Sequence, residues 1–188
     1  MPKLVIISHP EVVVNPEIAI TNWELSEVGR TRAEAFANAP IMASVSAIWS
    51  STERKAEQTA AILAKPHGLE VKVNLALGEN DRSATGFLPP HQFEAAADAF
   101  FAAPDVSFRG WETATDAQAR IVGAVTSIMD AHDGGDLAIV THGAVGTLLW
   151  CHLSGVRIDR QRDQPGQGHF WSADLDTLCC NQGWLAIA

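Results

Sequence analysis

Two short apolar runs, far apart in the chain, each end at a histidine. The first, KLVIIS at 3–8, is followed by His9, and the second, DLAIVT at 136–141, is followed by His142. Runs so rich in aliphatic and β-branched residues are typical of strands buried on both faces, as in parallel sheets covered by helices. Pro10 disfavours helical geometry at the preceding residue, so the first strand ends there. If the two strands are neighbours, both histidines reach the carboxyl edge, where open α/β sheets bind ligands.

The rest of the chain alternates helical and strand patterns. Helices are predicted where apolar residues recur at helical spacing or where start and stop signals mark a helix. These segments are 27–38, 53–65, 90–103, 113–132 and a segment that begins at 143. Ser51 and Thr52 are the expected caps of the second helix. Further strands are expected at 45–50 and 70–75, with an antiparallel pair at 169–175 and 178–187. This order predicts one α/β domain over residues 1–188, with a largely parallel sheet and an antiparallel edge.

One segment, 77–112, interrupts this alternation. Its first part is polar, is punctuated by Gly and Pro, and carries Glu79, Asp81 and Arg82. A helix and a second connector follow. We expect this segment to be an insertion that lies over the strand ends as a lid.

Composition excludes several classes of partner. The net charge of −9 argues against nucleic acid or an anionic membrane, and no apolar run reaches the length of a membrane-spanning helix. The N-terminus enters a strand directly and has no signal-peptide pattern. Three cysteines, Cys151, Cys179 and Cys180, make no disulfide framework, so a reducing cytoplasm is expected. Without Cys-x-x-Cys or His-Glu-x-x-His spacing, neither a metal nor another cofactor is expected.

The residues at the predicted edge suit phosphate chemistry. Gly143 and Ala144 begin a helix whose free N–H groups and positive dipole end would bind an anion. One histidine there can act as a nucleophile, and the other can donate hydrogen bonds to phosphate oxygens. A carboxylic acid must then protonate the leaving oxygen. Glu79 is the best candidate for this acid, and Asp81 is the reserve.

Five segments, in this order along the chain, match the motifs of one family. They are SHPEVVVN at 8–15 for an Arg-His-Gly-Glu opening, LSEVGR at 25–30 for a Leu-Ser/Thr-x-x-Gly-Arg helix start, SSTERKAEQTA at 50–60 for a Ser-Ser-Pro-Leu-Arg-Arg segment, LGE at 77–79 for Leu-x-Glu, and VTHGA at 140–144 for Val-x-His-Gly-Gly. The chain therefore resembles the histidine phosphatase superfamily, which includes the cofactor-dependent phosphoglycerate mutases. Any one motif is weak, but the ordered set spans most of the chain.

The resemblance implies a fold and a set of roles. The fold is a phosphoglycerate mutase-like three-layer α/β/α sandwich. His9 is the residue that becomes phosphorylated, His142 is its partner, and Glu79 is the acid. Asn15 is implied as a phosphate contact through its side-chain N–H donors.

This chain departs from the family where phosphate charge is bound. Ser8 replaces the arginine before the nucleophile, Pro10 replaces the following glycine, and Lys55 replaces the second phosphate-binding arginine. Serine is neutral and lysine is a point charge without the planar fork of arginine. Arg54 or Arg82 would compensate if either pointed inward. Arg54 is expected on a solvated helix face, whereas Arg82 lies in the loop nearest the acid.

Three functions remain open from the sequence. The first is a phosphomonoester hydrolase that acts on a small phosphorylated metabolite through a phosphohistidine. The second is a degenerate, non-catalytic member that binds phosphate or another anion, and the third is a phosphoglycerate mutase. Nucleotide binding at 142–146 has little support because the full G-x-G-x-x-G pattern is missing. A small phosphorylated substrate or phosphate is the expected partner, a homodimer is left open, and the substrate itself is not specified.

Overall fold

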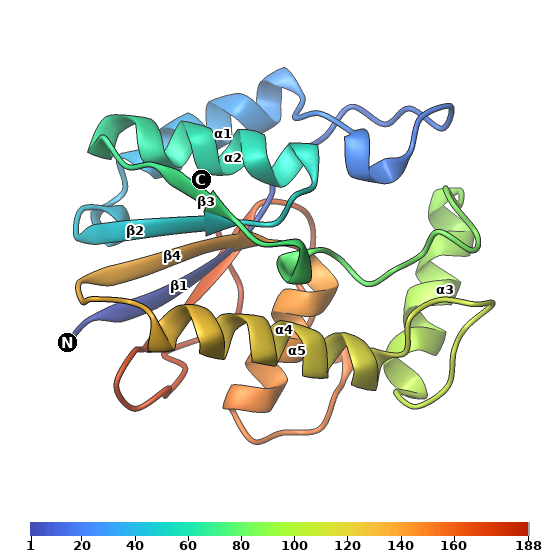
Figure 1. The fold of residues 1–188 in the computed structure, drawn as a ribbon. Coiled ribbons are helices and arrows are strands. Elements are labelled where there is room, and N and C mark those ends of the chain that lie inside the picture. The colour runs from blue at the N-terminus through green and yellow to red at the C-terminus, as the bar shows by residue number, and fades with distance from the viewer. Residues whose placement is uncertain (188) are drawn as a thin grey trace.

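The structure is a computed structural model that describes residues 1–187. Its centre is a six-stranded sheet in the order β3-β2-β4-β1-β5-β6 (Figure 1). The strands are β1 (Lys3–Ser8), β2 (Val45–Ser50), β3 (Val71–Val73), β4 (Asp136–Thr141), β5 (His169–Asp174) and β6 (Leu185–Ala186). β3, β2, β4 and β1 run parallel, whereas β5 and β6 are antiparallel to their neighbours. The predicted parallel sheet with an antiparallel edge is confirmed.

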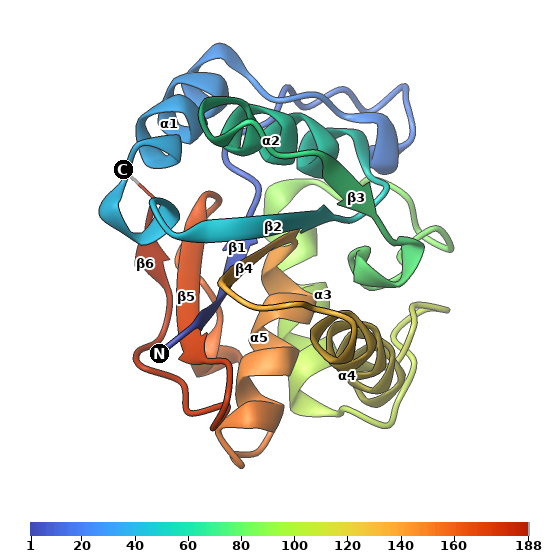
Figure 2. The ribbon, with the colours of Figure 1, turned by 60° about the vertical axis from the view of Figure 1, so that its left-hand side comes forward.

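Helices cover both faces of this sheet and make the three predicted layers (Figure 2). They are α1 (Glu27–Ala37), α2 (Arg54–Ala64), α3 (Pro90–Ala102), α4 (Ala114–Asp130) and α5 (Gly143–Leu153). Alternate residues of β1 face opposite layers: Val5 and Ile7 pack with α1 and α2, and Leu4 and Ile6 pack with α4 and α5. Burial on both faces explains why β1 and β4 read as unbroken apolar runs. None of the described helices is long and apolar enough to cross a bilayer.

The start of α2 and the C-terminal strand differ most from the prediction. α2 begins at Arg54 with Glu53 in the N-cap position, and it has no side-chain cap bond. Ser51 Oγ accepts the N–H of Glu53 (3.3 Å), ahead of the helix, and also contacts the ring of His142. The predicted strand 178–187 is reduced to β6, preceded by an isolated antiparallel bridge between Cys180 and Ala173. Its first residue, Leu178, has a left-handed backbone conformation (φ 56°), which an extended strand does not contain.

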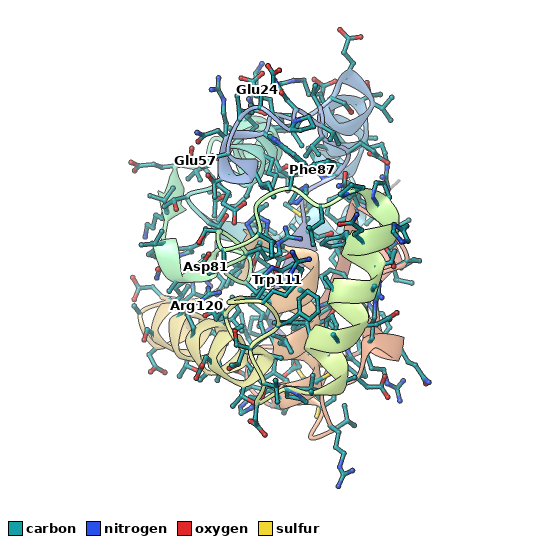
Figure 3. All side chains as sticks on the ribbon, turned by 90° about the vertical axis from the view of Figure 1, so that its right-hand side faces the viewer. Glu24, Glu57, Asp81, Phe87, Trp111 and Arg120 are labelled. Atoms are coloured by element: carbon teal, nitrogen blue, oxygen red, sulfur yellow. The ribbon has the colours of Figure 1, made fainter. Side chains whose placement is uncertain are left out.

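Segment 77–112 carries α3, which stands beyond the carboxyl ends of the parallel strands (Figure 1). Figure 3 views the molecule from this side, where the labelled Asp81, Phe87 and Trp111 mark the segment. Its inner side chains Phe100, Phe101 and Trp111 are buried in the same core cluster as α4 and α5. The segment therefore forms one wall of the region next to the strand ends, and its role as a lid stays a prediction.

Candidate active site

The two histidines meet at the carboxyl edge of the sheet. β1 and β4 are parallel neighbours with Ser8 opposite Thr141, so the residues that follow, His9 and His142, leave the sheet side by side. Their ring centroids lie 5.2 Å apart, with an angle of 66° between the ring planes. A cavity of about 600 Å³ opens at this edge and is lined by His9. His142 is fully buried next to it.

His9 is held as a neutral base. Its Nδ1 lies 3.0 Å from the carbonyl oxygen of Pro10, which can only accept, so Nδ1 carries the proton and Nε2 the lone pair. Burial and the nearby charge of Lys55 lower the pKa of His9 to about 4, against the opposing effects of Pro10 and Glu53. The imidazole is therefore unprotonated and nucleophilic over most of the pH range.

His142 is held neutral by burial. Its Nε2 lies 2.7 Å from Ser51 Oγ and 3.4 Å from a carboxylate oxygen of Glu53. Ser51 Oγ also accepts the N–H of Glu53, and its hydroxyl can either donate to Nε2 or accept from it, so the contact suits both tautomers of the ring. Burial holds the pKa of His142 well below its usual value, although Glu53 opposes this. Nδ1 is buried and has no hydrogen-bond partner among residues 1–187.

Glu79 lies across the N-terminus of α5. One carboxyl oxygen accepts the N–H of Ala144 (3.2 Å) and the other accepts the N–H of Val145 (3.1 Å). Burial raises the pKa of Glu79 above its usual value, and Glu53 adds to the rise while Arg82 opposes it. A carboxyl group with a raised pKa can be protonated closer to neutral pH, as a general acid requires. Glu79 also occupies one of the two N–H groups that the sequence assigned to phosphate.

Arg120, which sequence reasoning missed, positions the loop that carries Glu79. From α4 its guanidinium donates to the carbonyl oxygens of Ala76 (2.8 Å), Gly78 (2.9 Å) and Glu79 (3.1 Å). It also forms two hydrogen bonds with the Glu112 carboxylate, at 2.8 and 2.9 Å. Its rigid fork of donors fixes both the loop and the connector after α3. Figure 3 labels Arg120 below Asp81.

Glu53, also missed, pairs with Lys55. Lys55 Nζ contacts Glu53 Oε2 at 2.5 Å and donates to the carbonyl of Ile20 at 2.8 Å. Glu53 Oε1 accepts the backbone N–H of Glu79. Burial alone would raise the pKa of Glu53, but the charge and hydrogen bond of Lys55 hold it far below its usual value. Lys55, which aligns with the family arginine, therefore has its charge balanced by Glu53, which aligns with the family leucine.

Some of the other residues predicted to contact phosphate line the cavity, and others lie away from it. Arg82 lines the cavity and stacks its guanidinium on Phe93 (5.0 Å to the ring centroid) and Trp111 (5.7 Å). Lys55, Gly143 and Ala144 also line the cavity. Arg54 instead forms an ion pair with Glu24 on the exposed face of α2. Of the two arginines, Arg82 faces the cavity and Arg54 does not.

Ser8 and Asn15 do not line the cavity. Ser8 is fully buried and its hydroxyl contacts Gln164 and the backbone of His169. The side-chain oxygen of Asn15 accepts the N–H of Glu17 (3.0 Å) in a local turn. Asp81, the reserve acid, uses its carboxylate on the N–H of Ser83.

Comparison with models of known protein families identifies the family of this chain. The model of the histidine phosphatase superfamily, branch 1, matches residues 4–171. The chain belongs to branch 1 of the histidine phosphatase superfamily. No curated protein sequence matches it. The sequence resemblance to this superfamily is confirmed.

Solved structures share the fold of this histidine phosphatase family member. A mycobacterial glucosyl-3-phosphoglycerate phosphatase in complex with inorganic phosphate is 22% identical, with a TM-score of 0.81 and coverage of 100% of this chain and 99% of that chain. Bacillus stearothermophilus YhfR is 24% identical, with a TM-score of 0.81 and coverage of 96% and 95%. A phosphoserine phosphatase mutant from Entamoeba histolytica in complex with phosphoserine is 18% identical, with a TM-score of 0.75 and coverage of 92% and 90%.

Within residues 1–187, no cluster of three or more His, Cys, Asp or Glu side chains is arranged to hold a metal ion. The polar groups at this site are the imidazoles of His9 and His142, the buried carboxyl group of Glu79, and the cations of Lys55 and Arg82. Such a set can move a phosphoryl group by nucleophilic attack and proton transfer.

Proposed function

We propose that this protein is a phosphomonoester hydrolase that acts on a small phosphorylated metabolite through a phosphohistidine at His9. One observation supports it above the others: the ring of a neutral histidine with a free Nε2 lone pair lies 5.2 Å, between centroids, from the ring of a second histidine whose buried Nδ1 has no hydrogen-bond partner. Glu79, with its raised pKa, lines the same cavity. Nucleophile, donor and acid are thus available at one site.

The proposed reaction has two steps. Nε2 of His9 attacks phosphorus, the P–O ester bond breaks, and its electron pair leaves on the alcohol oxygen, to which Glu79 gives its proton. Water then attacks the phosphohistidine while the Glu79 carboxylate takes a proton from it. The P–N bond breaks, phosphate leaves, and both residues return to their starting state.

Charge on the phosphoryl group would be met by three kinds of donor. Arg82 supplies a guanidinium in the cavity, Lys55 supplies a partly balanced ammonium, and Nδ1 of His142 supplies a neutral donor in the tautomer that carries its proton there. An oxyanion seated against His9 is the acceptor that this buried N–H lacks. Because Arg82 is held only by ring stacking among the described residues, its N–H groups are free to turn to a ligand.

A second candidate is an anion-binding protein without turnover. Two observations favour it: Glu53 balances the charge of Lys55, and Glu79 occupies N–H groups at the start of α5. Both weaken the attraction for a dianionic phosphate. This candidate predicts saturable phosphate binding and no phosphate release.

Phosphate release separates the two candidates. Wild type, His9→Ala and His152→Ala are incubated with a panel of phosphomonoesters, and inorganic phosphate is measured. His152 is an exposed histidine of α5 and serves as the matched control. We expect release by wild type and His152→Ala and none by His9→Ala. Release at the wild-type rate by His9→Ala would overturn the mechanism, and phosphate binding without release would favour the second candidate.

A further inference from the structure

We propose that the carboxamide of Gln164 holds the transferring phosphoryl group in place of the arginine that Ser8 replaces. This inference rests on the proposed function, because it assigns a donor to that same site. Gln164 lies between the short 3-10 helix η5 (Arg160–Arg162) and β5, and its side chain lines the cavity together with His9.

The hydrogen bonds of Ser8 fix which end of the amide faces the sheet. Ser8 Oγ accepts the N–H of His169 at 3.0 Å. Two oxygens lie within reach of its own proton, and Gln164 Oε1 at 2.5 Å is nearer than the carbonyl oxygen of His169 at 3.2 Å. The 2.5 Å separation suits an O–H···O bond and is too short for an N–H···O bond. The carbonyl end of Gln164 therefore faces β1, and its NH₂ group faces away from it.

The NH₂ group lies at the start of α5. A Cβ atom built on Gly143 would be 2.3 Å from Gln164 Nε2 and 2.9 Å from Cδ, so the carboxamide lies directly against the first residue of the helix. A side chain at position 143 would push the carboxamide away, so glycine leaves room for the amide in this position. No described residue accepts a hydrogen bond from Nε2, so two N–H donors remain for a ligand in the cavity.

This placement gives Ser8 a defined role. The family arginine would bring charge and a fork of donors from β1, whereas Ser8 is buried and reaches only Gln164 and His169. Ser8 is thus a positioning residue that orients the amide, and Gln164 is the group that touches phosphate. The replacement is neutral, so it stabilises oxyanion charge through oriented N–H groups rather than through a full positive charge.

The test uses Gln164→Leu, which keeps the side-chain size and removes the donors. Gln161→Leu is the matched control, because Gln161 is an exposed glutamine of η5 that does not line this cavity. We measure kcat/KM and the affinity for orthovanadate by calorimetry, and check folding by circular dichroism. A lost hydrogen bond to a charged group predicts about a tenfold to hundredfold loss of both quantities in Gln164→Leu, and no change in Gln161→Leu. Wild-type values of both in a folded Gln164→Leu would overturn the proposal.

Two further variants keep the proposal testable. Ser8→Ala retains the amide but frees its orientation, and we expect a smaller loss than in Gln164→Leu. If Gln164→Leu fails to fold, Gln164→Glu replaces it: the carboxylate offers an acceptor instead of a donor, so vanadate affinity should fall at least as far. Unchanged affinity in Gln164→Glu would equally overturn the proposal.

The two readouts separate this inference from the proposed function. Wild type that binds vanadate but releases no phosphate contradicts hydrolysis, and the affinity of Gln164→Leu still decides the role of the amide. If Gln164→Leu hydrolyses esters as fast as wild type, only the role of the amide is contradicted. Wild type that neither binds nor hydrolyses contradicts both.

Discussion

Replacing Glu79 by glutamine separates its chemical role from its structural one. The glutamine keeps a carbonyl oxygen for the N–H groups of Ala144 and Val145, which the carboxyl group binds at 3.2 and 3.1 Å. It loses one acceptor oxygen, which costs about 1 kcal/mol of folding stability. It also loses the proton for the leaving group, and general acid catalysis contributes about 10²- to 10⁴-fold, or roughly 2.7–5.4 kcal/mol of barrier.

The assay compares two leaving groups. An alkyl phosphate leaves as an alkoxide and needs the proton, whereas p-nitrophenolate is stable enough to leave without it. We expect Glu79→Gln to lower kcat/KM about 10²- to 10⁴-fold for the alkyl ester and much less for p-nitrophenyl phosphate. Asp81→Asn is the control for the reserve acid and should leave both substrates unaffected. Equal losses on both esters, or a selective loss in Asp81→Asn, would refute the assignment of Glu79.

Three further predictions follow from the same structure. The pH profile of kcat/KM should rise through about pH 4 as the nucleophile loses its proton, and should fall above the usual carboxyl range as Glu79 ionises; Glu79→Gln should lack the falling limb. Arg120→Met should lose about 2–4 kcal/mol of folding stability, measured by urea unfolding. It should also lower kcat more for alkyl than for aryl esters, because Arg120 no longer positions the loop that carries Glu79. Equal effects on both esters would contradict that positioning role. Gly29→Ala should cost about 1–3 kcal/mol, because its Cβ would lie 2.2 Å from the Glu11 carbonyl oxygen. Gly123→Ala, with open space around its Cβ, should instead be neutral or stabilising.

Much of the fold could be predicted from the sequence. The apolar runs of β1 and β4 mark them as central strands of a parallel sheet, buried on both faces. That the two strands are neighbours was a condition of the sequence argument, and the pairing of β1 with β4 meets it. The convergence of His9 and His142 follows from this, because both residues come directly after these strands. The charged loop made Glu79 a candidate acid, and the family motif at 77–79 supported that choice over Asp81.

The other parts of the site depend on side-chain contacts between distant segments. Ser8 and Gln164 are separated by 156 positions, and nothing in either local sequence indicates that they touch. Glu53 had a signal, since it is a charged residue where the family motif has an apolar one, but its pairing with Lys55 within a buried site needs coordinates. The sequence also could not tell whether the Asn15 amide would bind phosphate or form a local turn, because an asparagine before proline suits both roles.

The most direct test of the account is to trap the phosphoenzyme. The protein is mixed with a ³²P-labelled phosphomonoester, quenched in denaturant at alkaline pH, where phosphohistidine survives, and mapped by peptide mass spectrometry. The account predicts one labelled peptide, modified at His9, that forms and decays fast enough to carry turnover and is absent from His9→Ala. Turnover without any labelled His9, or label on a different side chain, would contradict it.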